Sequence, residues 1–154
     1  IRFRTFSKAY GMAGARIGYA IAEKNLAVSF NKVRNHFGVS RISQAGALAA
    51  LNDQAYLQNI QQKVVDARIK ISDIAAAQGL HALPSQTNFV TIDCGKDGDF
   101  ARRVLDSLID QGVFARMPGV APMDRCIRIT VGRDEDLTIF ADALPKAIAA
   151  AEND

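Results

Sequence analysis

The chain has 154 residues, of which 49% are apolar and 23% charged, an ordinary soluble composition with enough apolar side chains for a core. Its net charge of +3 is spread along the chain without the clustered basic face that nucleic-acid binding requires, and no stretch approaches the roughly 20 apolar residues of a membrane span. The sequence therefore predicts a cytoplasmic protein with no nucleic-acid partner and no membrane partner.

The first third of the chain predicts two strands followed by two helices. Residues 1–6 alternate apolar and polar side chains, which indicates a strand, and residues 15–22 indicate a second one. Apolar side chains at close to helical spacing over 23–35 and small apolar ones over 40–52 indicate helices. Because residues 1–6 resemble the interior of a strand and no Met precedes them, we expect a longer parent polypeptide.

A long helix is predicted in the middle of the chain. Asp53 is a suitable N-cap, an apolar stripe runs through the segment from Tyr56 to Ile74, and Gly79 is placed to end the helix. Helices of this length often connect two domains.

The remaining segment has the pattern of a small α+β domain. It predicts strands over 87–94, 113–117 and 126–132, a helix over 99–111, and a last helix capped by Asp134 and running to about residue 151. We therefore expect an α/β protein in which residues 1–52 end one domain, residues 53–79 form the connecting helix and residues 80–154 form a small α+β sandwich.

Lys8 is the first candidate functional residue. A lysine in a small-residue turn after a strand can be partly desolvated, which lowers its pKa and makes the neutral amine a nucleophile. Thr5 and Ser7 offer hydroxyl groups nearby, and Arg16 offers a planar fork that suits a phosphate. The alternative is a surface lysine in a polar turn, with Arg16 paired to a carboxylate.

The segment TFSKAYGMAGARIGY, residues 5–19, resembles the lysine segment of fold-type I pyridoxal-phosphate (PLP) aminotransferases of class I/II, in particular the histidinol-phosphate aminotransferase branch. The resemblance implies that Lys8 forms the Schiff base with PLP and shuttles the substrate's proton. It also implies that Ser7, Arg16 and Thr5 hold the PLP phosphate. On this reading residues 1–52 are the end of the PLP-binding large domain.

Arg128 is the second candidate. In the strand 126–132, Ile127, Ile129 and Val131 point to one face, which puts Arg128 on the other. A partly buried guanidinium needs an anion, either a bound carboxylate or a helix acid such as Asp136.

The stretch IRITVGRDED, residues 127–136, resembles the segment of the same family in which the arginine binds the substrate's α-carboxylate. In histidinol-phosphate enzymes the corresponding group is the phosphate end. By resemblance to the family's entry strand, Asn88 in SQTNFV also lies near the active-site cleft.

The resemblance implies transamination between an amino acid, aromatic or histidinol-phosphate-like, and a 2-oxo acid. Family members are homodimers more than twice as long, so the chain alone is expected to bind PLP weakly and to have little or no activity. The alternatives are a PLP-dependent decarboxylase of the threonine-phosphate type and an aminotransferase-like ligand-sensing domain of a transcription regulator. Cys94 and Cys126 lie in apolar runs and are expected to be buried, reduced thiols rather than metal ligands.

Overall fold

The computed structural model describes residues 1–153, so the last residue of the predicted small domain, residue 154, lies outside the described part. Its internal contacts divide the chain into two compact units. We call Ile1–Gln62 the N-terminal unit and Lys63–Asp154 the C-terminal unit. The boundary falls inside the long helix α3 (Gln54–Ala77).

A two-stranded antiparallel sheet opens the N-terminal unit. It consists of β1 (Arg2–Thr5) and β2 (Gly18–Ile21), with Thr5 opposite Gly18. A Cβ at Gly18 would lie 2.6 Å from the Arg4 carbonyl oxygen, so the close pairing of the strands requires glycine there. Both predicted strands are confirmed, in shorter form.

Helices follow the sheet in the N-terminal unit. The predicted helix over 23–35 is only partly correct: α1 (Lys24–Ser29) is short and passes into the 3-10 turn η2 (Phe30–Lys32). Beyond η2 the Asn35 side chain accepts a hydrogen bond from the Phe37 N–H at 2.9 Å, so a local turn follows in place of further helix. In contrast, α2 (Arg41–Asn52) forms as predicted, with Ser40 as its N-cap.

The two predicted ends of α3 are confirmed. The Asp53 carboxylate accepts the Tyr56 N–H at 2.9 Å, and after Ala77 the chain turns at Gly79, whose φ is 71°. The predicted apolar stripe is buried only in the C-terminal unit, where Ile71 is fully buried, whereas Tyr56 is 45% exposed.

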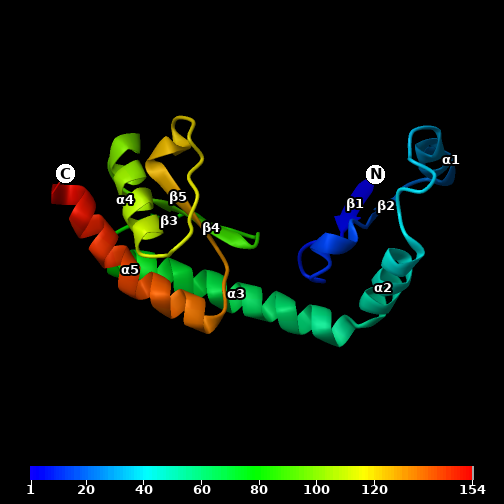
Figure 1. The fold of residues 1–154 in the computed structure, drawn as a ribbon, viewed down its shortest axis with the longest axis horizontal. Coiled ribbons are helices and arrows are strands. Elements are labelled where there is room, and N and C mark those ends of the chain that lie inside the picture. The colour runs from blue at the N-terminus through cyan, green and yellow to red at the C-terminus, as the bar shows by residue number, and fades with distance from the viewer. Residues whose placement is uncertain (154) are drawn as a thin grey trace. The chain divides into compact units, whose positions relative to one another are not determined.

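The C-terminal unit is an α+β structure. A three-stranded antiparallel sheet has the order β3 (His81–Ala82), β4 (Phe89–Asp93) and β5 (Cys126–Thr130). Two helices, α4 (Gly98–Asp110) and α5 (Asp134–Asn153), pack against each other beside β4 and β5 (Figure 1). Side chains from these elements and from α3 form one core, whose largest fully buried members are Ile71, Val90, Ile92, Val104, Leu108, Ile127, Phe140 and Leu144.

Two details of the predicted C-terminal unit are wrong, whereas the helix predicted over 99–111 is confirmed as α4. Residues 113–117 form no strand; they contribute only an isolated bridge between Arg116 and Arg128, because the chain continues into Pro118, which has no N–H to donate. Asp97 caps α4, which begins at Gly98. Asp134 is the first residue of α5 rather than its cap, and the Arg133 N–H donates to the Asp136 carboxylate at 3.0 Å.

Two expectations about composition can be compared with the structure. Cys94 and Cys126 are free and buried, as predicted, and burial raises the pKa of Cys94 to about 11. Among residues 1–153 no helix combines the length and the apolar character needed to span a membrane.

Candidate active site

Residues 6–17, which we call the lysine loop, connect β1 to β2. Its two ends meet, because the Phe6 N–H donates to the Ile17 carbonyl at 3.2 Å. The Met12 N–H donates to the Phe6 carbonyl at 2.9 Å, and the Gly11 N–H donates to the Lys8 carbonyl at 2.8 Å. The hairpin therefore places Lys8 and Arg16 in one closed loop.

Polar side chains of this loop, and of Thr5 just before it, carry an amine, hydroxyls and a guanidinium. Lys8 and Arg16 are exposed, and Ser7 is half-buried. The Thr5 hydroxyl accepts the Ser7 N–H at 3.1 Å, and Nη1 of Arg16 donates to the Ala13 carbonyl at 2.6 Å, which leaves the other guanidinium N–H groups for a ligand. An amine, hydroxyls and a guanidinium in one loop fit an aldehyde that carries a phosphate.

Arg128 lies in the middle of β5, where Thr91 faces it on β4. Ile127 and Ile129 are buried in the core while Arg128 is half-buried, so the predicted alternation of the strand is confirmed. The guanidinium lies over the Phe89 ring, 4.7 Å from its centroid.

No acid of residues 1–153 forms an ion pair with the Arg128 side chain. Its Nε is the one buried side-chain nitrogen or oxygen atom in residues 1–153 without a hydrogen-bond partner, and no ion pair of this part of the chain includes it. The alternative partner considered from sequence, Asp136, is bound by Arg133 instead, and this hydrogen bond lowers the pKa of Asp136. A bound anion would satisfy the guanidinium.

Arg116 was not among the candidates from sequence. Its backbone exchanges two hydrogen bonds with Arg128, at 3.2 and 2.6 Å. Directly opposite residues of an antiparallel bridge project their side chains to the same face, so two arginines share this face. Arg116 could have been found from the sequence by pairing the run 113–117 with the strand that carries Arg128.

Asn88 precedes β4, and its carbonyl accepts the Val131 N–H at 3.0 Å. The backbone thereby joins Asn88 to the end of β5, two residues beyond Ile129. Asn88 and Arg128 belong to the C-terminal unit, whereas Thr5, Ser7, Lys8 and Arg16 belong to the N-terminal unit.

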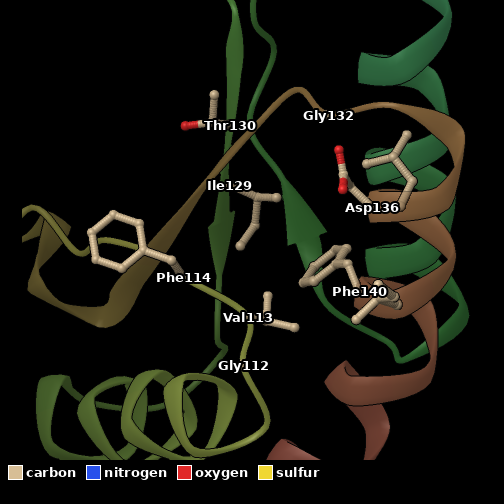
Figure 2. A pocket seen from close by; sticks show the side chains of 10 residues that line it. Gly112, Val113, Phe114, Ile129, Thr130, Gly132, Asp136 and Phe140 are labelled. Atoms are coloured by element: carbon tan, nitrogen blue, oxygen red, sulfur yellow. The ribbon is translucent and has the colours of Figure 1, made fainter.

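A separate cavity of about 210 Å³ lies within the C-terminal unit, between β5, the segment after α4 and the first turns of α5 (Figure 2). Apolar side chains such as Val113, Ile129 and Phe140 line it together with polar groups, and its single acid, Asp136, is already bound to Arg133. None of the predicted site residues lines it, so we do not assign the active site to this cavity.

Comparison with known proteins decides the family. The model of the aminotransferase class I and II family matches residues 1–144. The chain belongs to this family.

Within the aminotransferase class I and II family, the chain is similar to proteins named histidinol-phosphate aminotransferase. It is 39% identical over 145 residues to histidinol-phosphate aminotransferase 1 of Cupriavidus pinatubonensis, an alignment that covers 94% of this chain and 39% of that protein. It is 41% identical over 145 residues to the enzyme of Bacillus velezensis, covering 92% of this chain and 39% of the relative. The chain thus spans well under half of these relatives.

A solved structure extends the likeness to three dimensions. The crystal structure of histidinol-phosphate aminotransferase from Sinorhizobium meliloti in complex with pyridoxal-5'-phosphate matches with a TM-score of 0.91 and 54% identity, covering 96% of this chain and 41% of that one. The α/β fold class and the family predicted from the sequence are therefore confirmed.

Proposed function

We propose that the protein that carries this chain is a PLP-dependent aminotransferase, which transfers an amino group between histidinol phosphate or an aromatic amino acid and a 2-oxo acid. Family membership and the similarity to histidinol-phosphate aminotransferases support the reaction class. The PLP complex of the 54% identical neighbour supports the cofactor. The observation that carries the proposal is the closed lysine loop, whose backbone hydrogen bonds bring the loop ends that carry Lys8 and Arg16 close to each other.

Three residues of the loop, and Thr5 at the end of β1, have roles in this proposal. Lys8 would hold the cofactor through its ε-amine, which condenses with an aldehyde with loss of water, and the freed amine would move a proton at the substrate's α-carbon. Arg16 and Ser7, with Thr5, hold the phosphate by charge-assisted hydrogen bonds. The cofactor, when bound, supplies the electron sink.

In the same proposal, residues of the C-terminal unit bind the anionic group of the substrate. The unsatisfied Nε of Arg128 supports a role in binding the carboxylate or phosphate end of the substrate. Arg116, bridged to Arg128, adds a second positive charge on the same face, which favours a phosphate dianion. Asn88, joined to the end of β5 through its carbonyl, completes the substrate residues that we propose.

We further propose that residues 1–52 belong to a PLP-binding large domain, residues 53–79 to a connecting helix and residues 80–154 to a small domain, in a homodimer. The N-terminal unit supports additional packing, because Phe3, Phe37 and Ile42 are 66%, 95% and 86% exposed. Further chain or a second copy would cover such side chains. Sedimentation equilibrium of the intact protein measures the oligomeric state.

The test uses the intact protein that carries residues 1–154. After PLP is added, we expect a visible absorption band, and borohydride reduction followed by peptide mapping should place the label on Lys8. Lys8→Ala should lose both the band and the transamination, whereas Lys24→Ala, an exposed lysine of the same unit, should keep both. A label on another lysine would overturn the assignment, and release of carbon dioxide from the amino acid would identify a decarboxylase.

A further inference from the structure

Arg16 has an unusual backbone. Its φ and ψ are both 49°, and it is the one residue other than glycine with positive φ in residues 1–153. Every residue other than glycine has a Cβ atom, which is crowded in this left-handed conformation. The conformation therefore persists only where surrounding contacts enforce it. The Arg16 N–H and its Nη1 both donate to the Ala13 carbonyl, but these bonds lie within the turn itself.

The external contact comes from the first turn of α2. The Ser43 hydroxyl donates to the Ala15 carbonyl at 2.8 Å, a partly buried hydrogen bond between segments 28 residues apart. The peptide group of Ala15 is joined to the nitrogen of Arg16, so its rotation changes the φ of Arg16. Holding this carbonyl therefore holds the backbone of Arg16.

The direction of the Ser43 hydroxyl is itself fixed. The Ser40 hydroxyl donates to Ser43 Oγ at 2.9 Å, and the Ser43 N–H donates to Ser40 Oγ at 3.0 Å. With its oxygen occupied by this donor, the Ser43 hydroxyl is left to donate to Ala15.

A second contact one helical turn further along supports the same segment. At Gly46, a Cβ would lie 3.1 Å from the terminal methyl of Met12. Met12 precedes the 3-10 turn η1 (Ala13–Ala15), and Ala15 ends it. Residues of α2 therefore contact both the beginning and the end of the turn that precedes Arg16.

We propose that Ser43 is a positioning residue for phosphate binding: through the Ala15 carbonyl it holds Arg16 in the left-handed conformation that directs the guanidinium to the cofactor phosphate. This inference rests on the proposed function. It adds a residue of α2 to a site whose other members belong to the hairpin of β1 and β2.

The test separates phosphate binding from general folding. Spectroscopic titrations of the intact apoprotein would compare PLP with pyridoxal, which has the aldehyde but no phosphate. Ser43→Ala should weaken PLP binding roughly tenfold, the order expected for a hydrogen bond that orients a charged group, while the dissociation constant for pyridoxal stays within about twofold of wild type. Ser29→Ala is the matched control, because its hydroxyl also donates to a carbonyl, that of Asn25, away from the loop.

A double-mutant cycle tests the route through Arg16. In an Arg16→Ala background, Ser43→Ala should change PLP affinity little, because the guanidinium that it positions is gone. Ser43→Cys, a weaker donor of similar size, should give an intermediate loss and serves if Ser43→Ala does not fold. Equal losses for PLP and pyridoxal, or a full loss in the Arg16→Ala background, would overturn the inference.

The two proposals fail in different ways. If wild-type protein binds PLP at Lys8 and Ser43→Ala binds it equally well, only the positioning role of Ser43 is wrong. If wild-type protein takes up no PLP at Lys8, the proposed function and this inference are both overturned.

Discussion

The Arg128 guanidinium lies 4.7 Å from the centroid of the Phe89 ring, yet the Nε of the same side chain is buried without a partner. The face of the ring attracts the positive charge of the guanidinium. Burial of the nitrogen without a hydrogen-bond partner, in contrast, costs free energy. Arg128 Nε thus lacks a hydrogen-bond acceptor within residues 1–153, and the side chain is suited to bind an anionic ligand.

The first prediction follows from this unpaired nitrogen. Replacing Arg128 with Met removes the unpaired nitrogen and keeps an unbranched side chain against Phe89, so the free energy of unfolding should stay level or rise by about 1 kcal/mol. The same change should abolish saturation by the amino-acid substrate at accessible concentrations. Urea unfolding of the ligand-free intact protein and steady-state kinetics measure the two effects.

Arg133→Met is the matched control for this prediction. Arg133 is bound to Asp136, so its removal should lower stability slightly and leave the KM unchanged. A clear loss of stability in Arg128→Met would show that Arg128 is a structural residue.

Local sequence patterns predicted those parts of the fold that depend on interactions between residues near each other in the sequence. The alternation of Ile127 and Ile129 predicted the buried face of β5, and Asp53 predicted where α3 begins, because a capping side chain bonds to its own helix. The lysine segment predicted the family because its chemistry is contained in one continuous stretch.

Features that depend on tertiary contacts could not be read from the sequence. The run 113–117 has the composition of a strand, but only Arg116 finds a partner before Pro118 ends the pairing. The left-handed Arg16 depends on Ser43 in another element. Asp136 bonds to its near neighbour Arg133 instead of Arg128, a choice between two arginines that spacing leaves open.

The second prediction concerns pH and the ion pair between Asp93 and Arg125. Arg125 Nε donates to the Asp93 carboxylate at 2.8 Å, and this bond lowers the pKa of Asp93 below 3.8. Because the folded-state pKa is the lower one, the stabilisation is complete above pH 3.8 and is lost as pH falls through the folded-state value.

Asp93→Asn should therefore destabilise the protein by about 0.5 kcal/mol at pH 7, since Arg125 is partly exposed and the pair is screened. The difference from wild type should shrink in unfolding measurements at pH 3. Asp106→Asn, an exposed change of the same charge in α4, controls for net charge. A difference that grew at low pH would contradict the assigned direction.

The third prediction concerns the reactivity of Cys94. With a pKa of about 11 and a buried side chain, its thiolate fraction at pH 8 is about one in a thousand, against about one in ten for a thiol with the ordinary pKa of 9.0. Iodoacetamide labelling of a Cys126→Ser variant should thus be at least roughly a hundredfold slower in native protein than in urea. Equal rates in the two conditions would show that Cys94 is exposed and ionised.

The last prediction tests the base of the lysine loop. Gly18 faces Thr5 at the point where the loop begins, and a Cβ there would lie 2.6 Å from the Arg4 carbonyl oxygen, which is backbone and cannot swing aside. Gly18→Ala should therefore cost about 1–3 kcal/mol of unfolding free energy and weaken PLP binding. Gly14→Ala, in the same loop but with nothing within 4 Å of its added Cβ, should leave stability within about 0.5 kcal/mol of wild type. If thermal unfolding and PLP titration gave the same result for both variants, the strand pairing at Gly18 would not be what holds the loop closed.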